Sequence, residues 1–324
     1  MRTGIAAIVF AVFASQSGVT AAQRAADANY PSKPIRLIVP QAPGGSNDIM
    51  ARYIGGQVAE RLQKQVVVDN RPGAEGIIGS ELVARAAADG YTLLMASTAF
   101  TMNPAVMKKL PYDPIKDFDF AAVLGRGPVM IVAGPSLAVN SLKELIALAK
   151  SKPNFITIAS AGGFNHFVSA MFRSHAGFDA TIALYKGGGP ALIDVMGGHA
   201  HMAAPTIVTA APHLRTGKIK ALAISAPKRL SVMPDLPTMI EAGLPSYDAS
   251  IWWGWASASG TPMPVLTKLN TEVAAVLKLP ETAKRMAAEG AEVEIRSIAE
   301  IRAMIKDDLV KWAKVAEDAK MPKQ

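Results

Sequence analysis

A glycine turn at residues 43–48 carries the residue types and spacing best suited to hold a small anion. An apolar run at 35–39 predicts a buried parallel strand, and apolar residues that recur at intervals of four from Met50 onward predict a helix after the turn. The first N–H groups of such a helix point outward above the end of the strand, where a carboxylate or phosphate can accept them. The same pattern also joins ordinary βα units, so it leaves both readings open.

The individual residues of this turn refine its chemistry. Gly44 and Gly45 let the backbone approach a ligand without interference from a Cβ atom, and Ser46 or Asn47 can cap the helix. A charge at Asp48 competes with a phosphate for the positive end of the helix, so a carboxylate ligand is favoured. We expect Asp48 to orient water or to accept a donor from the ligand.

The sequence lacks the motifs by which common catalytic sites are recognised. It contains no G-x-S-x-G elbow, no Walker A motif and no H-E-x-x-H pair. The glycines at 73–79 do not have the dinucleotide-binding spacing, and we interpret this segment as a loop. Ser160 and His166 could act as nucleophile and base, but no acid that would orient the histidine is identified, so His166 is more simply a donor to an anion or to its own turn. We therefore predict no catalytic residue and no cofactor.

His199 and His201 are the best candidates for metal ligands, because alternate residues of a strand share one face. No third ligand lies nearby in the sequence, and two nitrogens do not make a metal site. Two solvated strand histidines are the favoured interpretation, so we predict no metal site.

Composition and charge indicate an exported globular protein. The chain has 324 residues, of which 50% are hydrophobic, which is enough for two domains. The net charge is +8, but Lys and Arg are dispersed and aromatic residues make up only 6%, which argues against nucleic-acid binding and favours a small acidic ligand. Residues 1–22 have the order of a signal peptide, and cysteine is absent, so we predict a free periplasmic protein without disulfides or a lipid anchor.

Strand and helix patterns alternate along the chain, which predicts an α/β fold. The opening strand, glycine turn and helix recur near residues 155–176, so we expect a second lobe whose turn faces the first across a cleft. The chain crosses between the lobes near 123–134 and returns through an aromatic strand at 251–258. The predicted divisions are a signal peptide at 1–22, a discontinuous first lobe at 29–126 plus 252–324, and a second lobe at 127–251.

Six segments in order along the chain resemble the Bug, or TctC-like, family of periplasmic solute receptors that serve tripartite tricarboxylate transporters. They are YPSKPIRLIVPQAPGGSNDIMAR, VVVDNRPGAEGIIG, ADGYTLLMAS, NPAVMKKLPYDPIKDF, YKGGGPALIDVMGG and LPTMIEAGLPSY. The resemblance implies a two-lobed periplasmic-binding-protein fold of the Venus-flytrap, type II-like architecture, with two crossover strands. It also implies that the protein captures a small organic carboxylate by cleft closure and delivers it to the membrane subunits of a transporter.

The resemblance further implies ligand-binding residues in both lobes, which hold a carboxylate mainly through backbone groups and ordered water. In the first lobe they are Gly44, Gly45, Ser46, Asn47, Asp48, Ser97 and Thr98. In the second lobe they are Ser160, Ala161, Gly162, Gly163, His166 and Thr206.

Two departures from the family pattern bear on the ligand. The turn at 160–166 is shorter than the commoner form, and the segment at 203–206 reads AAPT where many relatives have an acidic residue. An aspartate that would read a ligand ammonium group is missing there, so we expect a ligand without an amine, such as a di- or tricarboxylate or an aromatic carboxylate. A ligand-sensing receptor for a periplasmic signalling partner is the alternative function, and a secreted hydrolase is a weaker one. We expect a monomer.

Overall fold

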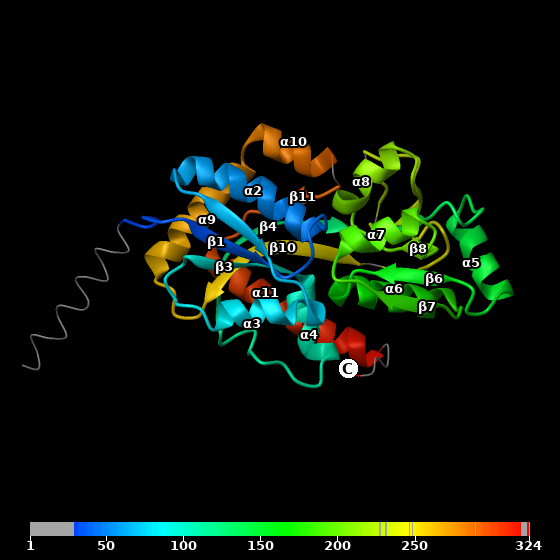
Figure 1. Cartoon of the computed structure of the whole chain (residues 1–324), viewed down its shortest axis with the longest axis horizontal. Helices are drawn as coiled ribbons and strands as arrows, with labels where there is room; N and C mark the ends of the chain where they lie inside the picture. The colour runs from blue at the N-terminus through cyan, green and yellow to red at the C-terminus, as the bar shows by residue number, and fades with distance from the viewer. Residues whose placement is uncertain are drawn as a thin grey trace, which may run out of the picture.

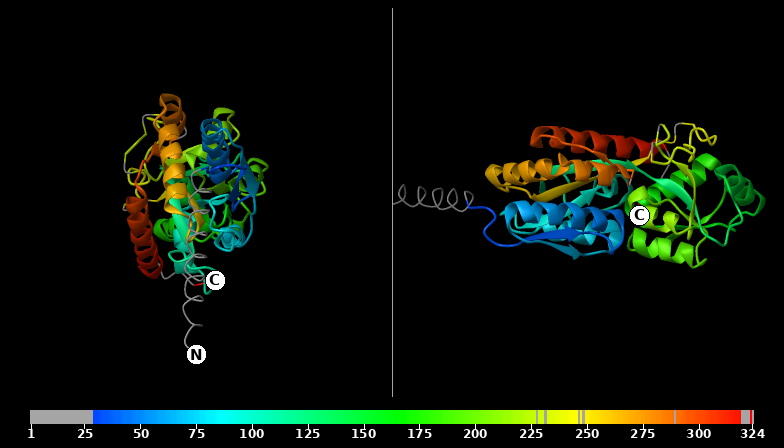
Figure 2. Two further views of the ribbon diagram at one scale, coloured as in Figure 1. Left: turned by 90° about the vertical axis from the view of Figure 1, so that its left-hand side faces the viewer. Right: turned by 90° about the horizontal axis from the view of Figure 1, so that it is seen from above.

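The structure, a computed structural model, describes residues 29–318 apart from 227, 231, 246, 248 and 289, together with residue 323. The predicted signal peptide at 1–22 lies outside the described residues. The described chain forms two β-sheets that lie side by side along the long axis, each with its own helices (Figures 1 and 2). No described helix combines the length and the apolar character needed to cross a bilayer.

The first sheet collects strands from both ends of the chain. Its spatial order is β11-β4-β10-β3-β1-β2, and its strands are β1 (Ile35–Val39), β2 (Val66–Asn70), β3 (Thr92–Ser97), β4 (Phe118–Pro128), β10 (Ser250–Ala258) and β11 (Glu292–Val293). β1 runs parallel to β2 and β3, whereas β10 pairs antiparallel with β3 and β4. The carboxyl ends of β1 and β3 therefore meet at one edge of the sheet, where ligands of open α/β sheets bind.

The second sheet is built from the middle of the chain. Its spatial order is β7-β6-β8-β5-β9, and its strands are β5 (Met130–Ala133), β6 (Thr157–Ser160), β7 (Thr181–Leu184), β8 (Met202–Ala203) and β9 (Lys220–Ile224). β4 leads through Val129 into β5, and β10 returns the chain to the first sheet. These are the two predicted crossovers, so the two-lobed α/β class is confirmed. The exact lobe boundaries, 29–126 plus 252–324 and 127–251, stay a prediction.

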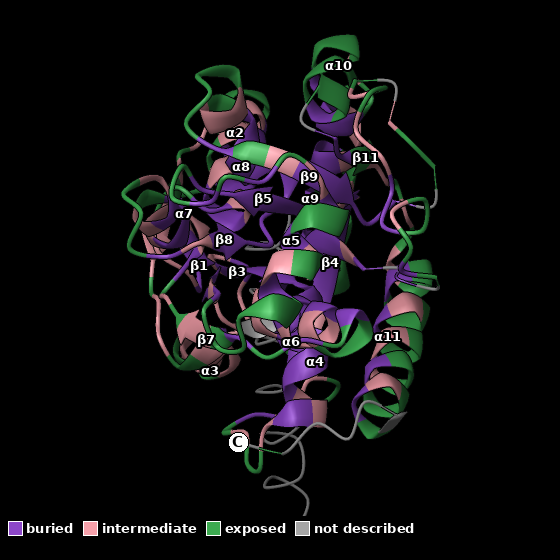
Figure 3. Cartoon of the chain, turned by 90° about the vertical axis from the view of Figure 1, so that its right-hand side faces the viewer, coloured by how far each residue is buried: buried purple, intermediate pink, exposed green. Residues whose placement is uncertain are grey.

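Helices cover both faces of the first sheet, because successive strand residues point to opposite sides. Leu37 and Trp253 pack in the core beneath α2 (Ser46–Leu62), α9 (Met263–Leu277) and α10 (Pro280–Ala288). Ile38 and Trp252 pack in a separate core beneath α3 (Ile77–Ala84), α4 (Thr98–Val106) and α11 (Ile298–Asp318). Figure 3 shows α4 almost entirely buried between its neighbours.

The second sheet is covered in the same way. The helices α5 (Leu142–Ser151) and α6 (Gly163–Ala176) share a core with Ile131 and Ile158, whereas α7 (Gly188–Met196) and α8 (Ile207–Arg215) pack with Met130 and Val132. The sequence S-x-x-E at 141–144 predicts a capping box at the start of α5, and the structure confirms it, since the Ser141 hydroxyl accepts the N–H of Glu144 at 3.2 Å.

The last helix, α11, connects the two halves of the molecule. Its residues Ile301 and Ile305 are buried in the core of the first sheet. Further along, Trp312 lies edge-on to Phe164 and Phe167 of α6, with ring centroids 5.9 Å and 5.3 Å apart. The C-terminal helix therefore stabilises the position of α6, which begins at the site described below.

One local prediction is wrong. The sequence predicts a loop over 69–79 and a helix over 80–88, whereas the structure has a 3-10 turn at Ala74–Gly76 and then α3, which begins at Ile77 and ends at Ala84. Gly79 lies inside this helix. A glycine stands there because α3 packs directly on Pro40. A Cβ at Gly79 would lie 2.9 Å from the Pro40 Cβ. The glycine reports close packing rather than a loop.

Candidate functional site

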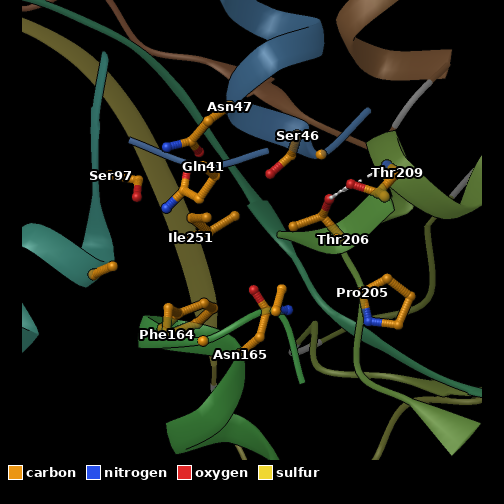
Figure 4. Close-up of a pocket in the computed structure, with 15 residues that line it drawn as sticks. Gln41, Ser46, Asn47, Ser97, Phe164, Asn165, Pro205, Thr206, Thr209 and Ile251 are labelled. Atoms are coloured by element: carbon orange, nitrogen blue, oxygen red, sulfur yellow. Dashed lines mark hydrogen bonds between the residues drawn. The ribbon is translucent and has the colours of Figure 1, made fainter. Parts of the chain in front are cut away.

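A pocket lies between the two halves of the molecule, lined by the segments that follow β1, β3, β6, β7 and β8 and by the start of β10 (Figure 4). The first half contributes Gln41, Gly45, Ser46, Asn47, Ser97, Ala99 and Ile251, and the second contributes Ala161, Gly162, Phe164, Asn165, Gly188, Pro205, Thr206 and Thr209. The hollow measures about 450 Å³ when the open solvent at its mouth is included. Among these described lining residues, none carries a charge.

The start of α2 forms one wall of the pocket. Gly45 is the N-cap in an extended conformation, and no side chain caps the helix, so the predicted capping by Ser46 or Asn47 is wrong. The N–H of Ile49 is the first to bond within the helix, to the Gly45 carbonyl at 3.0 Å. The N–H groups before it have no partner inside the helix, as at every helix start. Those of Ser46 and Asn47 belong to residues that line the pocket and are available to an anion.

Asp48 holds this turn in place and does not line the pocket. Its carboxylate accepts the Gly44 N–H at 3.0 Å, the Asn70 amide at 3.0 Å and the Arg52 guanidinium at 2.9 Å. Burial alone would raise the pKa of Asp48, but the hydrogen bonds from Arg52, Gly44 and Asn70 outweigh it and hold the pKa below its usual range. The carboxylate therefore orients the glycine turn, and its contact with the ligand stays a prediction.

The end of β3 and the start of α4 form the floor of the pocket. Ser97 is buried and lines the pocket, and Thr98 begins α4. The Thr98 hydroxyl accepts the backbone N–H of Trp252 at 2.9 Å, which ties the floor to β10. The indole N–H of the fully buried Trp253 donates to the Ser46 hydroxyl at 3.3 Å. The aromatic strand β10 thus supports the wall formed by the start of α2.

The opposite wall comes from the second sheet. Gly162 is the N-cap of α6 with φ +76°, a conformation that glycine adopts readily. Asn165 donates its side-chain amide to the Ala204 carbonyl at 2.7 Å, which leaves its amide oxygen for the pocket. Thr206 caps α8, and its hydroxyl lies 3.1 Å from that of Thr209, as the dashed line in Figure 4 marks.

Five of the described helices begin at this pocket. They start at Ser46 for α2, Thr98 for α4, Gly163 for α6, Gly188 for α7 and Ile207 for α8, and each has a lining residue at its N-cap or in its first turn. A helix N-terminus carries partial positive charge and unsatisfied N–H donors. Their convergence on a pocket without charged lining residues makes the site suited to a small anion, held by backbone groups and hydroxyls.

The two walls also touch each other directly. The loop after β1 donates the Ala42 N–H to the carbonyl of Lys186, after β7, at 2.8 Å. The two glycine segments are so close that a Cβ on Gly45 would lie 3.3 Å from the backbone nitrogen of Gly188. The structure is therefore a closed arrangement of the two halves.

The structure brings seven of the thirteen predicted site residues into the lining of this pocket: Gly45, Ser46, Asn47, Ser97, Ala161, Gly162 and Thr206. The other six lie in the same turns without lining it: Gly44, Asp48, Thr98, Ser160, Gly163 and His166. Their role in ligand binding stays a prediction. The sequence reasoning missed eight lining residues: Gln41, Ala99, Phe164, Asn165, Gly188, Pro205, Thr209 and Ile251. Two of them had a visible signal in the sequence: Gly188 in the K-G-G-G-P segment, and Phe164 in the glycine turn at 160–166.

Two of the groups considered for catalysis or metal binding, Ser160 and His201, have structural partners. The Ser160 hydroxyl is fully buried and accepts the Gly162 N–H at 3.4 Å. His201 accepts the Thr157 N–H at 3.0 Å through Nδ1, its ring lies tilted against that of Phe155, and burial lowers its pKa. Among the described residues no cluster of histidine and acidic side chains could hold a metal ion.

Comparison with known proteins places these observations in a family. The chain matches the family described as tripartite tricarboxylate transporter family receptor over residues 50–321. It is 34% identical to Protein BugT of Bordetella pertussis over 314 residues, which cover 96% of each chain.

Two similar solved structures contain a ligand. One is R. palustris Rpa4515 with adipate, with 30% identity, a TM-score of 0.88, and coverage of 91% of this chain and 100% of that one. The other is MatC from Rhodopseudomonas palustris with bound malate, with 32% identity, a TM-score of 0.84, and coverage of 88% and 99%.

Proposed function

The chain belongs to the family of tripartite tricarboxylate transporter receptors, and from this premise we propose that it captures a small organic carboxylate between its two lobes and delivers it to the membrane subunits of such a transporter. Receptors of this family are periplasmic solute-binding proteins and not enzymes. The order of residues 1–22, typical of a signal peptide, agrees with export to the periplasm.

The observation that carries this proposal is the convergence of helix N-termini on a pocket whose described lining bears no charge. The N–H donors at the starts of α2 and α6 lie on opposite sides of the pocket, so one carboxylate group can accept from both. Hydrogen bonds to an ionised acceptor are roughly twice as strong as neutral ones, which gives the carboxylate its advantage.

The ligand class follows from relatives and from the residues that line the pocket. The similar structures carry adipate and malate, which are dicarboxylates. A di- or tricarboxylate of similar length, or a small aromatic carboxylate, matches a lining that combines helix starts with the apolar side chains of Phe164 and Ile251. We propose this class for the present chain.

Delivery requires a change of shape that the membrane subunits can recognise. A carboxylate held by both walls favours the arrangement in which Ala42 and Lys186 are bonded, so the ligand shifts an open population towards the closed one. The same closed shape would serve a signalling partner equally well. Co-purification with the transporter's membrane subunits in the presence of ligand supports transport, and capture of a sensor protein instead favours the alternative.

Isothermal titration with a panel of mono-, di- and tricarboxylates tests the ligand class. We expect at least one member to bind, and we expect its neutral amide to bind far more weakly, because the helix starts select the charge. Equal binding of the carboxylate and its amide would contradict the proposal.

A further inference from the structure

A side pocket opens next to the main one and contains an acidic residue that the account above does not use. It measures about 210 Å³ counted with its opening and shares Gln41, Ser97 and Ala99 with the main pocket. Its other walls come from α4 and from the 3-10 turn Ala74–Gly76, including Glu75 and Asn103. The side pocket has room for about one water-sized group, so a small substituent on a ligand in the main pocket can occupy it.

Glu75 is held there by an unusual backbone. It has φ +56° and ψ +29°, and the preceding Ala74 also has a positive φ of +45°. Residues with a Cβ avoid this left-handed region, and two in succession are uncommon. Because local strain of this kind clusters at functional sites, the conformation suggests that the position of the Glu75 side chain matters.

One acceptor atom in the side pocket has no donor. Oε1 of Glu75 is shielded from solvent and has no hydrogen-bond partner among the described residues. The neighbouring Asn103, a residue only 2% exposed, donates its amide nitrogen to the Glu75 carbonyl at 3.4 Å, and its side chain also interacts with the Tyr112 hydroxyl. Buried acceptors are nearly always satisfied in native proteins, so the unpartnered Glu75 oxygen in a ligand cavity points to a donor that the ligand brings.

Glu75 also faces the second lobe. A Cβ on Gly162, the N-cap of α6, would lie 3.8 Å from the Cγ of Glu75. The carboxylate thus lies beside the boundary between the two walls that hold the ligand, and a group bound to it would be enclosed when the lobes meet.

We propose that this side pocket binds a hydrogen-bond donor on the carboxylate ligand, either a hydroxyl or an ammonium group, and that Glu75 is the accepting group. The inference rests on the proposed function and narrows its substrate class to hydroxy- or amino-substituted carboxylates. A plain dicarboxylate that reached this pocket would bring a second negative charge beside Glu75, which is unfavourable. Glu75 thus supplies, from the side pocket, the acidic group that is missing from 203–206.

The test compares ligands that differ in a single group. Succinate, malate and aspartate form one set, and the corresponding plain, 2-hydroxy and 2-amino dicarboxylates with five and six carbons form two more. In at least one set we expect the wild-type protein to bind the hydroxyl or ammonium member about tenfold or more tightly than the plain one, since hydrogen bonds to charged groups have this strength.

Three variants separate the effect of the Glu75 carboxylate from the effect of the backbone conformation at residues 74 and 75. E75G removes the side chain and relieves the positive φ, and we expect it to lose the preference while still binding the plain acid. E75Q keeps an acceptor without charge, so it should retain most of a hydroxyl preference but lose an ammonium preference, which tells the two donors apart. A74G is the matched control, because it relieves the neighbouring positive φ at an exposed residue without touching the carboxylate, and it should leave the preference unchanged.

The outcomes distinguish this inference from the function on which it rests. If wild-type protein binds carboxylates but prefers no donor-bearing member, or if E75G keeps the preference, the side-pocket proposal is overturned and carboxylate capture stands. If wild-type protein binds neither these acids nor any of the wider carboxylate panel, both proposals fail.

Discussion

The backbone N–H of Ala42 donates to the carbonyl of Lys186 at 2.8 Å, which joins the loop after β1 in the first sheet to the loop after β7 in the second. Around this bond the chain on both sides is rich in glycine. A Cβ on Gly189 would lie only 2.6 Å from the Pro43 carbonyl oxygen, a distance that real Cβ atoms do not tolerate. The closed contact between the lobes therefore depends on the absence of side chains at this point.

The first prediction concerns this contact. Gly189→Ala places a methyl group against the Pro43 carbonyl, so the two loops must separate to accommodate it. Because the obstructing atom belongs to the backbone of the other lobe, we expect ligand affinity to fall at least about tenfold while the fold is retained. Isothermal titration with the best-binding carboxylate measures the loss, and circular dichroism checks the fold.

Gly56→Ala is the matched control for that substitution. Gly56 is an exposed residue in the interior of α2, and a Cβ there meets no atom within 4 Å. Alanine in a helix interior is favoured over glycine by about 0.5–1 kcal/mol, so this variant should be slightly more stable with unchanged affinity. Unaltered ligand binding by Gly189→Ala would show that the loop contact has no part in closure.

The second prediction concerns Asp48, whose carboxylate holds the glycine turn at 43–48 in place. Asp48→Ala removes the acceptor of the Gly44 N–H and leaves Asn70 and Arg52 without their partner. Because Asp48 positions the turn without lining the pocket, we expect weaker ligand binding, by about tenfold, in a folded protein. Arg52→Ala removes one partner that is half exposed and should change the affinity little. Equal effects of the two variants would argue against a positioning role for the carboxylate.

The third prediction follows from the lowered pKa of Asp48. A carboxyl group whose pKa is lower in the folded than in the unfolded chain stabilises the fold above its unfolded pKa, about 3.9 for aspartate, and this contribution is lost as the pH falls through the folded pKa. The difference in unfolding free energy between wild type and Asp48→Ala should therefore be largest near neutral pH and shrink below about pH 4. Urea unfolding at several pH values measures it. A difference that is constant across this range would mean that the ionised form of Asp48 is not the stabilising one.

The fourth prediction concerns the helix that connects the two halves. Trp312 is 3% exposed and packs edge-on against Phe164 and Phe167 of α6. Trp312→Ala should lower the unfolding free energy by about 3–5 kcal/mol through the lost burial and the cavity. Val310→Ala, on the same helix but 71% exposed, should change it by less than about 0.5 kcal/mol. Denaturant unfolding compares them, and similar small effects would contradict the packing described for α11.

Patterns that depend on near neighbours in the chain were predictable from the sequence. Of the predicted stripe on α2, Met50, Ile54 and Val58 are fully buried, and Leu62 at the end of the helix is partly buried against the same core. The capping box at Ser141 forms as its motif indicates. The two crossovers could also be placed, because apolar strands there stand apart from the regular alternation with helices.

Features that depend on how distant segments meet could not be predicted in this way. The use of the Asp48 carboxylate within the turn could not be foreseen, because its partner Asn70 lies on a neighbouring strand. Gln41, Asn165 and Thr209 have no distinguishing local pattern and line the pocket only because the two lobes meet there. Glu75 was not identified as a site residue, because a positive φ is not predicted for a glutamate from its residue type.

A crystal structure of the complex with the best-binding carboxylate shows directly which groups hold the ligand. We expect a ligand carboxylate within hydrogen-bond distance of backbone N–H groups at the starts of both α2 and α6, near Ser46 and Gly163, with no lysine or arginine side chain holding it. A carboxylate bound elsewhere, or held by a basic side chain without contact to either helix start, would contradict it.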